Sequence, residues 1–229
     1  MGVLSSHAKR YGIELNGVQL ERFQLYLDEL WGWNQKINLT GLRNKESMLV
    51  ELFLDSLIPA PFLPREGRML DVGSGAGFPG VPLKIHNPRL ETDLLEINAK
   101  RVSFLRHIIR LMKLEGVRVI RGRIEKEGGM LHPDGYHIIT ARALAPLPQT
   151  VGWCAPFLRQ GGILVGFLGA RAGEDLKESR EVFEKHGLML EREHPYSLPG
   201  KRSERSSVIL RREEQGMRIR RKQREASFP

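Results

Sequence analysis

The chain has 229 residues, of which 41% are hydrophobic and 28% are charged, and its formal net charge is +9, which is ordinary for a globular protein with one substantial core. A single cysteine excludes an intramolecular disulfide, and the seven histidines lie outside any metal-ligand spacing, so no metal is expected. The first ten residues lack the apolar core of a signal peptide and no apolar run could cross a bilayer, so we expect a cytoplasmic protein without membrane contact.

The first 64 residues carry two helical patterns. Asn16 can cap a helix that runs to about residue 35, with apolar side chains recurring at helical spacing. A second helix is predicted over about 45–57, and three prolines between residues 59 and 64 then break the chain. We interpret residues 1–64 as a helical cap that packs on the rest of the chain.

A glycine turn follows the cap. A buried strand is predicted over 68–72, and Gly73, Gly75 and Gly77 come directly after it at alternate positions. A helix pattern opens around Pro79, which a first helical turn tolerates because its missing N–H would have no partner there. This sequence of strand, glycines and helix start is typical of a nucleotide-binding crossover, since glycine lets the backbone approach a ligand and the helix start offers free N–H donors.

Two cofactors fit this turn. Residues 75–80 match the dinucleotide fingerprint G-x-G-x-x-G, and residues 71–77 match D-x-G-x-G-x-G, which is typical of S-adenosylmethionine (SAM) methyltransferases. In a SAM site Asp71 and the glycine backbone would face the amino-acid part of the cofactor. A second acid, Glu96, ends a predicted strand over 90–96 and would accept the ribose hydroxyls of either cofactor. These residues predict an adenosine-containing ligand without choosing between NAD and SAM.

The alternation of strands and helices from residue 68 onward predicts an α/β core over 65–212, with a mostly parallel seven-stranded sheet and helices on both faces. Asn98 is expected to cap the helix after Glu96. The other expected elements are strands at 117–121, 136–141, 161–168, 188–193 and 206–211, and helices at about 147–158 and 174–186. The last two strands form an antiparallel pair, which belongs to methyltransferases rather than to NAD folds and therefore favours SAM.

Five short motifs carry a resemblance to a known family. They are Asn-Leu-Thr at 38–40, Leu-Asp-Ser-Leu at 54–57, Asp-Val-Gly-Ser-Gly-Ala-Gly-Phe-Pro-Gly-Val-Pro-Leu at 71–83, Lys-Arg-Val-Ser-Phe-Leu at 100–105 and Ala-Arg-Ala at 141–143. From about Leu20 to about Arg212, the chain resembles the bacterial small-subunit ribosomal RNA guanine-N7 methyltransferases, also called glucose-inhibited division protein B. The resemblance implies a Rossmann-like class I methyltransferase, SAM as methyl donor, and N7 of one guanine in the 530-loop region of 16S rRNA as acceptor.

The resemblance also implies which residues hold SAM: Gly73, Phe78, the pair Ile124 and Glu125, and Arg142. The third strand ends just before this pair, so Glu125 or the local backbone could meet the adenine edge. The chain departs from the family at one place. Many members carry a basic residue and a histidine before Leu-Asp-Ser, where this chain has Glu51 and Leu52, so no role of that histidine is transferred.

Absent residues narrow the chemistry of the acceptor. Carbon-5 methylation of pyrimidines needs a cysteine nucleophile, and Cys154 lies in a predicted helix away from the strand ends. Exocyclic-amine methyltransferases usually carry an Asn/Asp-Pro-Pro-aromatic run where residues 140–144 read Thr-Ala-Arg-Ala-Leu. Guanine N7 fits the remaining acceptors, because its lone pair can attack the methyl group without prior loss of a proton. Arg142, the predicted catalytic residue, would orient the SAM carboxylate or an RNA group, with a surface arginine as the alternative.

We therefore predict a methyltransferase that acts on 16S rRNA or the small ribosomal subunit, as a monomer. The positive charge agrees with an RNA partner, although a generic basic surface explains it equally well. Residues 213–229 form a basic tail that either contacts RNA phosphates or is merely disordered. Two other functions stay open: an NAD-dependent oxidoreductase, and a non-catalytic RNA-binding protein with a vestigial nucleotide pocket.

Overall fold

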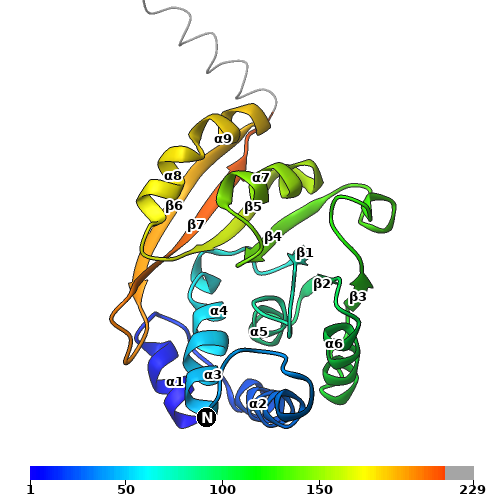
Figure 1. Ribbon diagram of the computed structural model, residues 1–229, viewed down its shortest axis with the longest axis vertical. Helices are drawn as coiled ribbons and strands as arrows, with labels where there is room; N and C mark the ends of the chain where they lie inside the picture. Colours follow the sequence, from blue (N-terminus) through cyan, green and yellow to red (C-terminus); the bar gives the residue numbers. More distant parts are fainter. Residues whose placement is uncertain (215–229) are drawn as a thin grey trace, which may run out of the picture.

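A seven-stranded sheet organises the computed structural model, which describes residues 1–214 (Figure 1). The strands lie in the order β3-β2-β1-β4-β5-β7-β6, and all neighbours are parallel except the pairs β5–β7 and β6–β7. The strands are β1 (Gly67–Val72), β2 (Leu90–Glu96), β3 (Val117–Arg121), β4 (Tyr136–Arg142), β5 (Leu158–Leu168), β6 (Leu188–Ser197) and β7 (Glu204–Arg212). The order reverses between β1 and β4, and ligands of such sheets bind at that point, outside the carboxyl ends of the strands. The predicted α/β class, the seven strands and the antiparallel last pair are confirmed.

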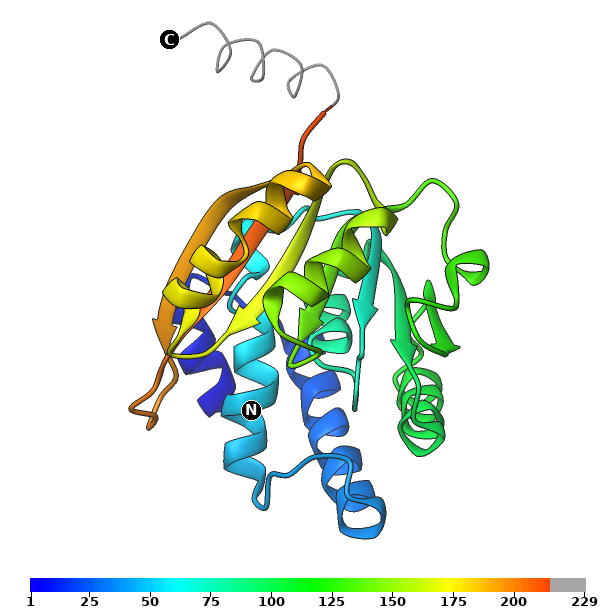
Figure 2. The same cartoon turned by 45° about the horizontal axis from the view of Figure 1, so that its top comes forward.

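Helices cover both faces of this sheet. One face carries α5 (Gly80–His86) and α6 (Ala99–Leu111), together with the N-terminal helices. The other face carries α7 (Leu147–Cys154), α8 (Ala172–Glu178) and α9 (Arg180–His186). Figure 2 shows these last three, in green and yellow, in front of the sheet, with the blue and cyan N-terminal helices on the opposite side. Within β1 the faces alternate as a strand requires, with Met69 in the core on one side and Leu70 in the core on the other.

The N-terminal helices are α1 (Gly2–Lys9), α2 (Gly17–Ile37), α3 (Lys45–Met48), a π-helical turn η1 (Leu49–Leu54), α4 (Asp55–Leu57) and a 3-10 turn η2 (Ala60–Phe62). The predicted cap of α2 is confirmed, because the Asn16 side chain accepts the Gln19 N–H at 2.9 Å and the Gln19 side chain accepts the Asn16 N–H. The predicted helix over 45–57 is present, with the π-helical turn in its middle. The sequence did not predict α1, which has no side-chain cap at its start.

An aromatic cluster joins these helices to the rest of the molecule. Phe78, just before α5, stacks on Tyr26 of α2 with ring centroids 5.2 Å apart, and Phe53 meets it edge-on at 5.1 Å. Phe104 of α6 completes the cluster at 6.2 Å from Tyr26. The N-terminal helices therefore share one hydrophobic core with α5 and α6. The division of the chain at residues 64 and 212 stays a prediction, and most of the predicted tail 213–229 lies outside the described residues.

Several element boundaries differ from those predicted. The helix expected over 147–158 ends at Cys154, because Pro156 turns the chain into a short 3-10 segment, and β5 then starts at Leu158. The helix expected over 174–186 is split at Ser179, whose hydroxyl donates to the Asp175 carbonyl at 2.6 Å. The hairpin strands β6 and β7 run further than the strands expected at 188–193 and 206–211, so their connection covers only residues 198–203.

Two negative findings apply to residues 1–214. No helix in that range is both long enough and apolar enough to span a membrane. The same range contains no group of three or more His, Cys, Asp or Glu side chains that could hold a metal ion.

Candidate cofactor site

The glycine turn has the left-handed backbone that its sequence predicts. Gly73, Gly75 and Gly77 have φ values of +69°, +60° and +100°, which side chains other than glycine rarely adopt. The N–H groups of Gly73 and Ser74 donate to the Leu95 carbonyl at 2.9 and 3.0 Å. These bonds tie the turn to β2, so the turn has a defined shape at the carboxyl end of β1.

The glycines of the turn serve different purposes. A Cβ at Gly77 would lie 2.5 Å from the Tyr26 hydroxyl, and a Cβ at Gly80 would lie 2.5 Å from Leu94. Both glycines therefore make room for the protein itself. A Cβ at Gly73 would meet a methyl group of Leu144 at 2.8 Å, whereas a Cβ at Gly75 would have no atom closer than 3.9 Å. Of the glycines between residues 73 and 80, Gly75 is the one that presents bare backbone to open space.

Asp71 lies beneath the turn. Its side chain is fully buried, with one oxygen accepting the Gly80 N–H at 3.0 Å and the other accepting the Thr140 hydroxyl at 2.8 Å. Burial raises the pKa of this carboxyl to about 6. The carboxyl thus links β1, β4 and the start of α5. This differs from the expectation that Asp71 faces the cofactor, because the sequence pattern gives the position of the acid but not the direction of its side chain.

Glu96 closes the other side of the turn. Its Oε2 accepts the Gly75 N–H at 2.8 Å and its Oε1 accepts the Asn98 N–H at 2.7 Å, at the capped start of α6. Arg101 lies 3.9 Å from Oε2. A carboxylate has about four acceptor positions, so this one can still accept hydroxyl donors from a ligand. The structure thus brings Glu96 directly beside the open Gly75, and its binding of ribose hydroxyls stays a prediction.

Ile97 is a candidate that the sequence analysis missed. It follows Glu96 where the chain leaves β2, and its side chain is 47% exposed. The chain after β3 runs beside it, since the Gly122 N–H donates to the Glu96 carbonyl at 3.2 Å. The signal was an isoleucine immediately after the strand-end acid, where the sheet no longer covers it.

The two residues predicted as a pair after β3, Ile124 and Glu125, differ in exposure. The Ile124 side chain is buried in the core on the α7 face of the sheet, so only its backbone can meet a ligand. Glu125 is exposed, on the loop that passes Glu96.

Phe78 and Arg142 lie together on the β4 side of the site. The Arg142 guanidinium carbon lies 5.5 Å from the centre of the Phe78 ring, within cation–π distance. The same guanidinium donates to the Glu51 carbonyl oxygen and to an Asp55 carboxylate oxygen, both at 3.2 Å. Phe78 is buried and Arg142 is 17% exposed. The resemblance assigned both residues to the SAM site, but it did not predict that they meet each other or that Arg142 pairs with Glu51 and Asp55 on the N-terminal helices.

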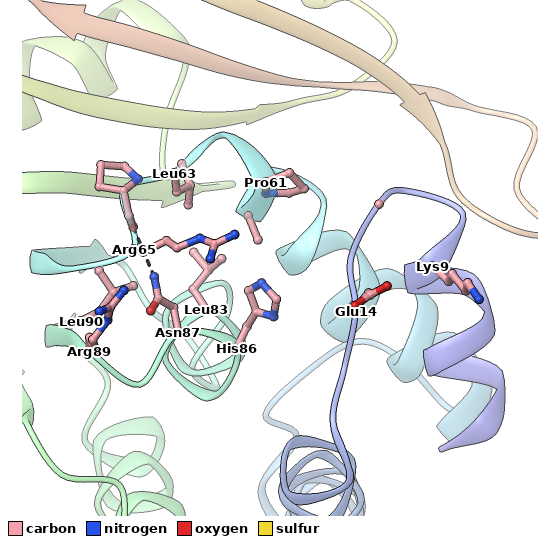
Figure 3. A pocket seen from close by; sticks show the side chains of 13 residues that line it. Lys9, Glu14, Pro61, Leu63, Arg65, Leu83, His86, Asn87, Arg89 and Leu90 are labelled. Atoms are coloured by element: carbon pink, nitrogen blue, oxygen red, sulfur yellow. Dashed lines mark hydrogen bonds between the residues drawn. The ribbon is translucent and has the colours of Figure 1, made fainter.

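A cavity of about 640 Å³ lies away from the glycine turn. Figure 3 shows it between η2, the end of α5 and the segment around Glu14, with Arg65 and His86 among the residues that line it. Leu90, the first residue of β2, belongs to its wall. The cavity is therefore at the amino edge of the sheet, away from the glycine turn, and its position excludes it as the cofactor site of this fold.

The family model described as rRNA small subunit methyltransferase G matches residues 19–203. The chain belongs to this family, GidB. Two relatives named ribosomal RNA small subunit methyltransferase G illustrate the match. The protein from Oceanobacillus iheyensis is 34% identical over 90% of this chain and 88% of its own length, and the protein from Chloroflexus aggregans is 38% identical over 87% and 84%.

Solved structures agree on the fold. A SAM-dependent methyltransferase from Aquifex aeolicus matches with a TM-score of 0.56 at 19% identity, over 72% of this chain and 93% of its own. TYW2 from M. jannaschii, crystallised with AdoMet, matches with a TM-score of 0.57 at 16% identity, over 69% and 74%. The GidB chain is thus a SAM-dependent methyltransferase of small-subunit ribosomal RNA, which confirms the predicted enzyme class and cofactor. The NAD-dependent and non-catalytic alternatives do not hold.

Proposed function

We propose that this GidB-family enzyme methylates N7 of one guanine in the 530-loop region of 16S rRNA, as the family resemblance implies. The observation that carries the proposal is the bare backbone of Gly75 beside the Glu96 carboxylate, at the same sheet edge as Arg142. SAM supplies a methyl group activated by its sulfonium. Guanine N7 has a free lone pair, so the protein's task is to hold the two reactants in line rather than to remove a proton.

The β2 side of the site fits an adenosine cofactor. Glu96 has acceptor capacity for ribose hydroxyls, and the exposed Ile97 offers an apolar wall for a base. The backbone of Ile124 and the side chain of Glu125 border the same place. Gly75 gives the closest backbone approach that the turn allows, since a Cβ there would occupy open space.

The remaining predicted site residues lie around the place where the cofactor would approach the Gly75 backbone. Gly73 and Gly77 shape the turn, and Asp71 supports it from below through Gly80 and Thr140. Arg142 and the Phe78 ring beneath it would face the reacting end of the site. There Arg142 would orient either the carboxylate of SAM or a phosphate or base of the RNA, since a guanidinium binds both kinds of group.

Access to N7 defines the form of the substrate. N7 lies on the major-groove edge of guanine, and that groove is too deep and narrow in double-stranded RNA for side chains to reach. We therefore infer that the target guanine is looped or flipped out. The net charge of +9 would provide phosphate contacts, which predicts that binding weakens steeply with salt. We further propose that the enzyme acts as a monomer and in the cytoplasm, where its ribosomal substrate is found.

Labelled SAM and 16S rRNA that lacks the modification test the reaction. We expect one 7-methylguanine per RNA, located by mass spectrometry of nuclease fragments. Methyl groups found on another atom, or at scattered guanines, would contradict the proposal.

A matched pair of glycine variants tests the cofactor site. Gly75→Ala should lower SAM affinity in calorimetry by at least about tenfold, because the added methyl group blocks the backbone approach. Gly12→Ala is the control, since Gly12 also has a positive φ of +72° and open space around its Cβ position, outside the glycine turn. Equal SAM affinities of the two variants would show that the turn does not hold the cofactor.

A further inference from the structure

A charged cluster joins the N-terminal helices to the carboxyl edge of the sheet. Two acids, one tyrosine and three cations meet there from parts of the chain that are far apart in the sequence: Glu51, Asp55, Tyr196, Arg142, Lys201 and Arg205. The acids come from the π-helical turn and the first residue of α4, Arg142 ends β4, and the others belong to the β6–β7 hairpin. π-Helical turns occur frequently at functional sites.

Asp55 is the centre of this cluster. Its side chain is 1% exposed, and its two oxygens serve different elements. Oδ2 accepts from the Arg142 guanidinium at 3.2 Å, whereas Oδ1 accepts from the Tyr196 hydroxyl at 2.7 Å and lies 3.3 Å from Arg205. A carboxylate buried to this extent depends on every partner, because losing one leaves an uncompensated charge. The position of Arg142 is thereby linked to the position of the hairpin.

Glu51 has a different orientation. Its carboxylate lies 2.7 Å from Lys201 and 3.3 Å from Arg205, so its charge is directed at the hairpin. Arg142 reaches Glu51 only through the backbone carbonyl oxygen of that residue. Within residues 1–214, Asp55 is therefore the carboxylate that pairs with Arg142.

We propose that Asp55 is a positioning residue for methyl transfer: it fixes the Arg142 guanidinium above the Phe78 ring and couples it to the β6–β7 hairpin. This inference rests on the proposed role of Arg142 at the reacting end of the site. Without Asp55 the guanidinium would keep only the Glu51 carbonyl oxygen and the Phe78 ring as partners. The Arg142 side chain would then rotate more freely. A displacement of about 1 Å at a reacting group can cost about a hundredfold in rate, so this restraint has a measurable effect on turnover.

A double-mutant cycle on kcat tests the proposal. We expect Asp55→Asn to lower kcat by about 10- to 100-fold while the SAM dissociation constant changes by less than about twofold. Arg142→Ala should lower kcat at least as much, and adding Asp55→Asn to it should lower kcat no further, because Asp55 acts through Arg142. Asp28→Asn is the matched control, since Asp28 also pairs with a cation, Lys45, on the N-terminal helices, and its kcat should equal that of the unmodified enzyme. Independent, multiplying losses in the double variant would overturn the proposal.

A measurement without catalysis separates this proposal from the proposed function. In ¹⁵N-arginine-labelled enzyme, the side-chain signals of Arg142, assigned by their loss in Arg142→Lys, should show hindered rotation that disappears in Asp55→Asn. Unchanged signals would overturn the inference. If Arg142→Ala instead retains full kcat, the role of Arg142 fails, and the spectra still report whether Asp55 holds the guanidinium.

A milder variant covers the case in which Asp55→Asn does not fold. Tyr196→Phe removes only the O–H donor to Oδ1 and leaves all charges in place. We expect roughly a threefold loss of kcat, the size of one hydrogen bond, together with faster rotation of the Arg142 side chain. Unchanged kcat and unchanged rotation in this variant would count against the proposal.

Discussion

The two sides of the predicted cofactor site, at the carboxyl edge of the sheet, are held together by different kinds of interaction. On the β2 side, Gly75 and Glu96 are 21 positions apart and meet through a backbone N–H. On the β4 side, Arg142 meets Asp55 across 87 positions through two charged side chains, and Tyr196 meets Asp55 across 141. The first side is a backbone site that short motifs encode. The second depends on the packing of the whole fold, so its parts have no common motif.

This difference predicts which kind of substitution disrupts each side. A backbone site fails when a side chain is added, whereas a side-chain site fails when a charge is removed. The turn also depends on the N-terminal helices, because the Tyr26 hydroxyl donates to the Ala76 carbonyl inside it. Four measurements, beginning with the largest expected effect, test how separate the two sides are.

Gly77→Ala should have the largest effect, on folding. The new methyl group would lie 2.5 Å from the Tyr26 hydroxyl and 2.8 Å from Val81, at a φ of +100°. Strain and overpacking together should lower the free energy of unfolding by about 4 kcal/mol, as measured by denaturant titration. Gly12→Ala, with the strain but without the contacts, should cost about 1 kcal/mol. Equal losses would mean that α2 does not support the turn.

The Asp71 carboxyl should make stability depend on pH. Its pKa is raised by burial from an ordinary value of 3.8 to about 6, so between these values the folded chain keeps a proton that the unfolded chain releases. The stability that this group provides is present below pH 4 and is lost as the pH rises to about 6, an expected change of about 3 kcal/mol. Urea titrations at several pH values should show this loss in the natural chain relative to Asp71→Asn. A natural chain that keeps or gains stability relative to Asp71→Asn as the pH rises would contradict the assignment.

Glu96→Gln should weaken SAM by about tenfold in calorimetry, or about 1.4 kcal/mol, because an amide offers ribose hydroxyls fewer and weaker acceptors than a carboxylate. Its effect on kcat at saturating SAM should be small, since the β4 side is untouched. A large loss of kcat without a loss of SAM affinity would show that the two sides are not separate.

Ile97→Ser should have the smallest effect, about a threefold loss of SAM affinity, because it removes an exposed apolar wall rather than a specific bond. Leu111→Ser is the control, since Leu111 is similarly exposed, at 40%, but lies at the far end of α6. Equal SAM affinities of the two variants would remove Ile97 from the site.

The sequence predicted what local patterns specify. It predicted β2 and β3 to the residue, and the caps Asn16 and Asn98, because periodicity and capping are read within a few positions. It did not predict that Asp71 points beneath the turn, since a motif fixes the order of residues and not the direction of their side chains. The sequence also did not predict the pairing of Asp55 with Arg142, because such contacts depend on tertiary packing.

The π-helical turn at Leu49–Leu54 holds one residue more than a regular helical turn would. Deleting one residue there would leave an ordinary helix whose flanking parts keep their relative orientation, because the wide turn had already absorbed the extra residue. The change would be confined to the turn, where Glu51 offers its carbonyl oxygen to Arg142 and its carboxylate to Lys201 of the hairpin. The extra residue thus sets the place of Glu51 rather than the course of the helices on either side.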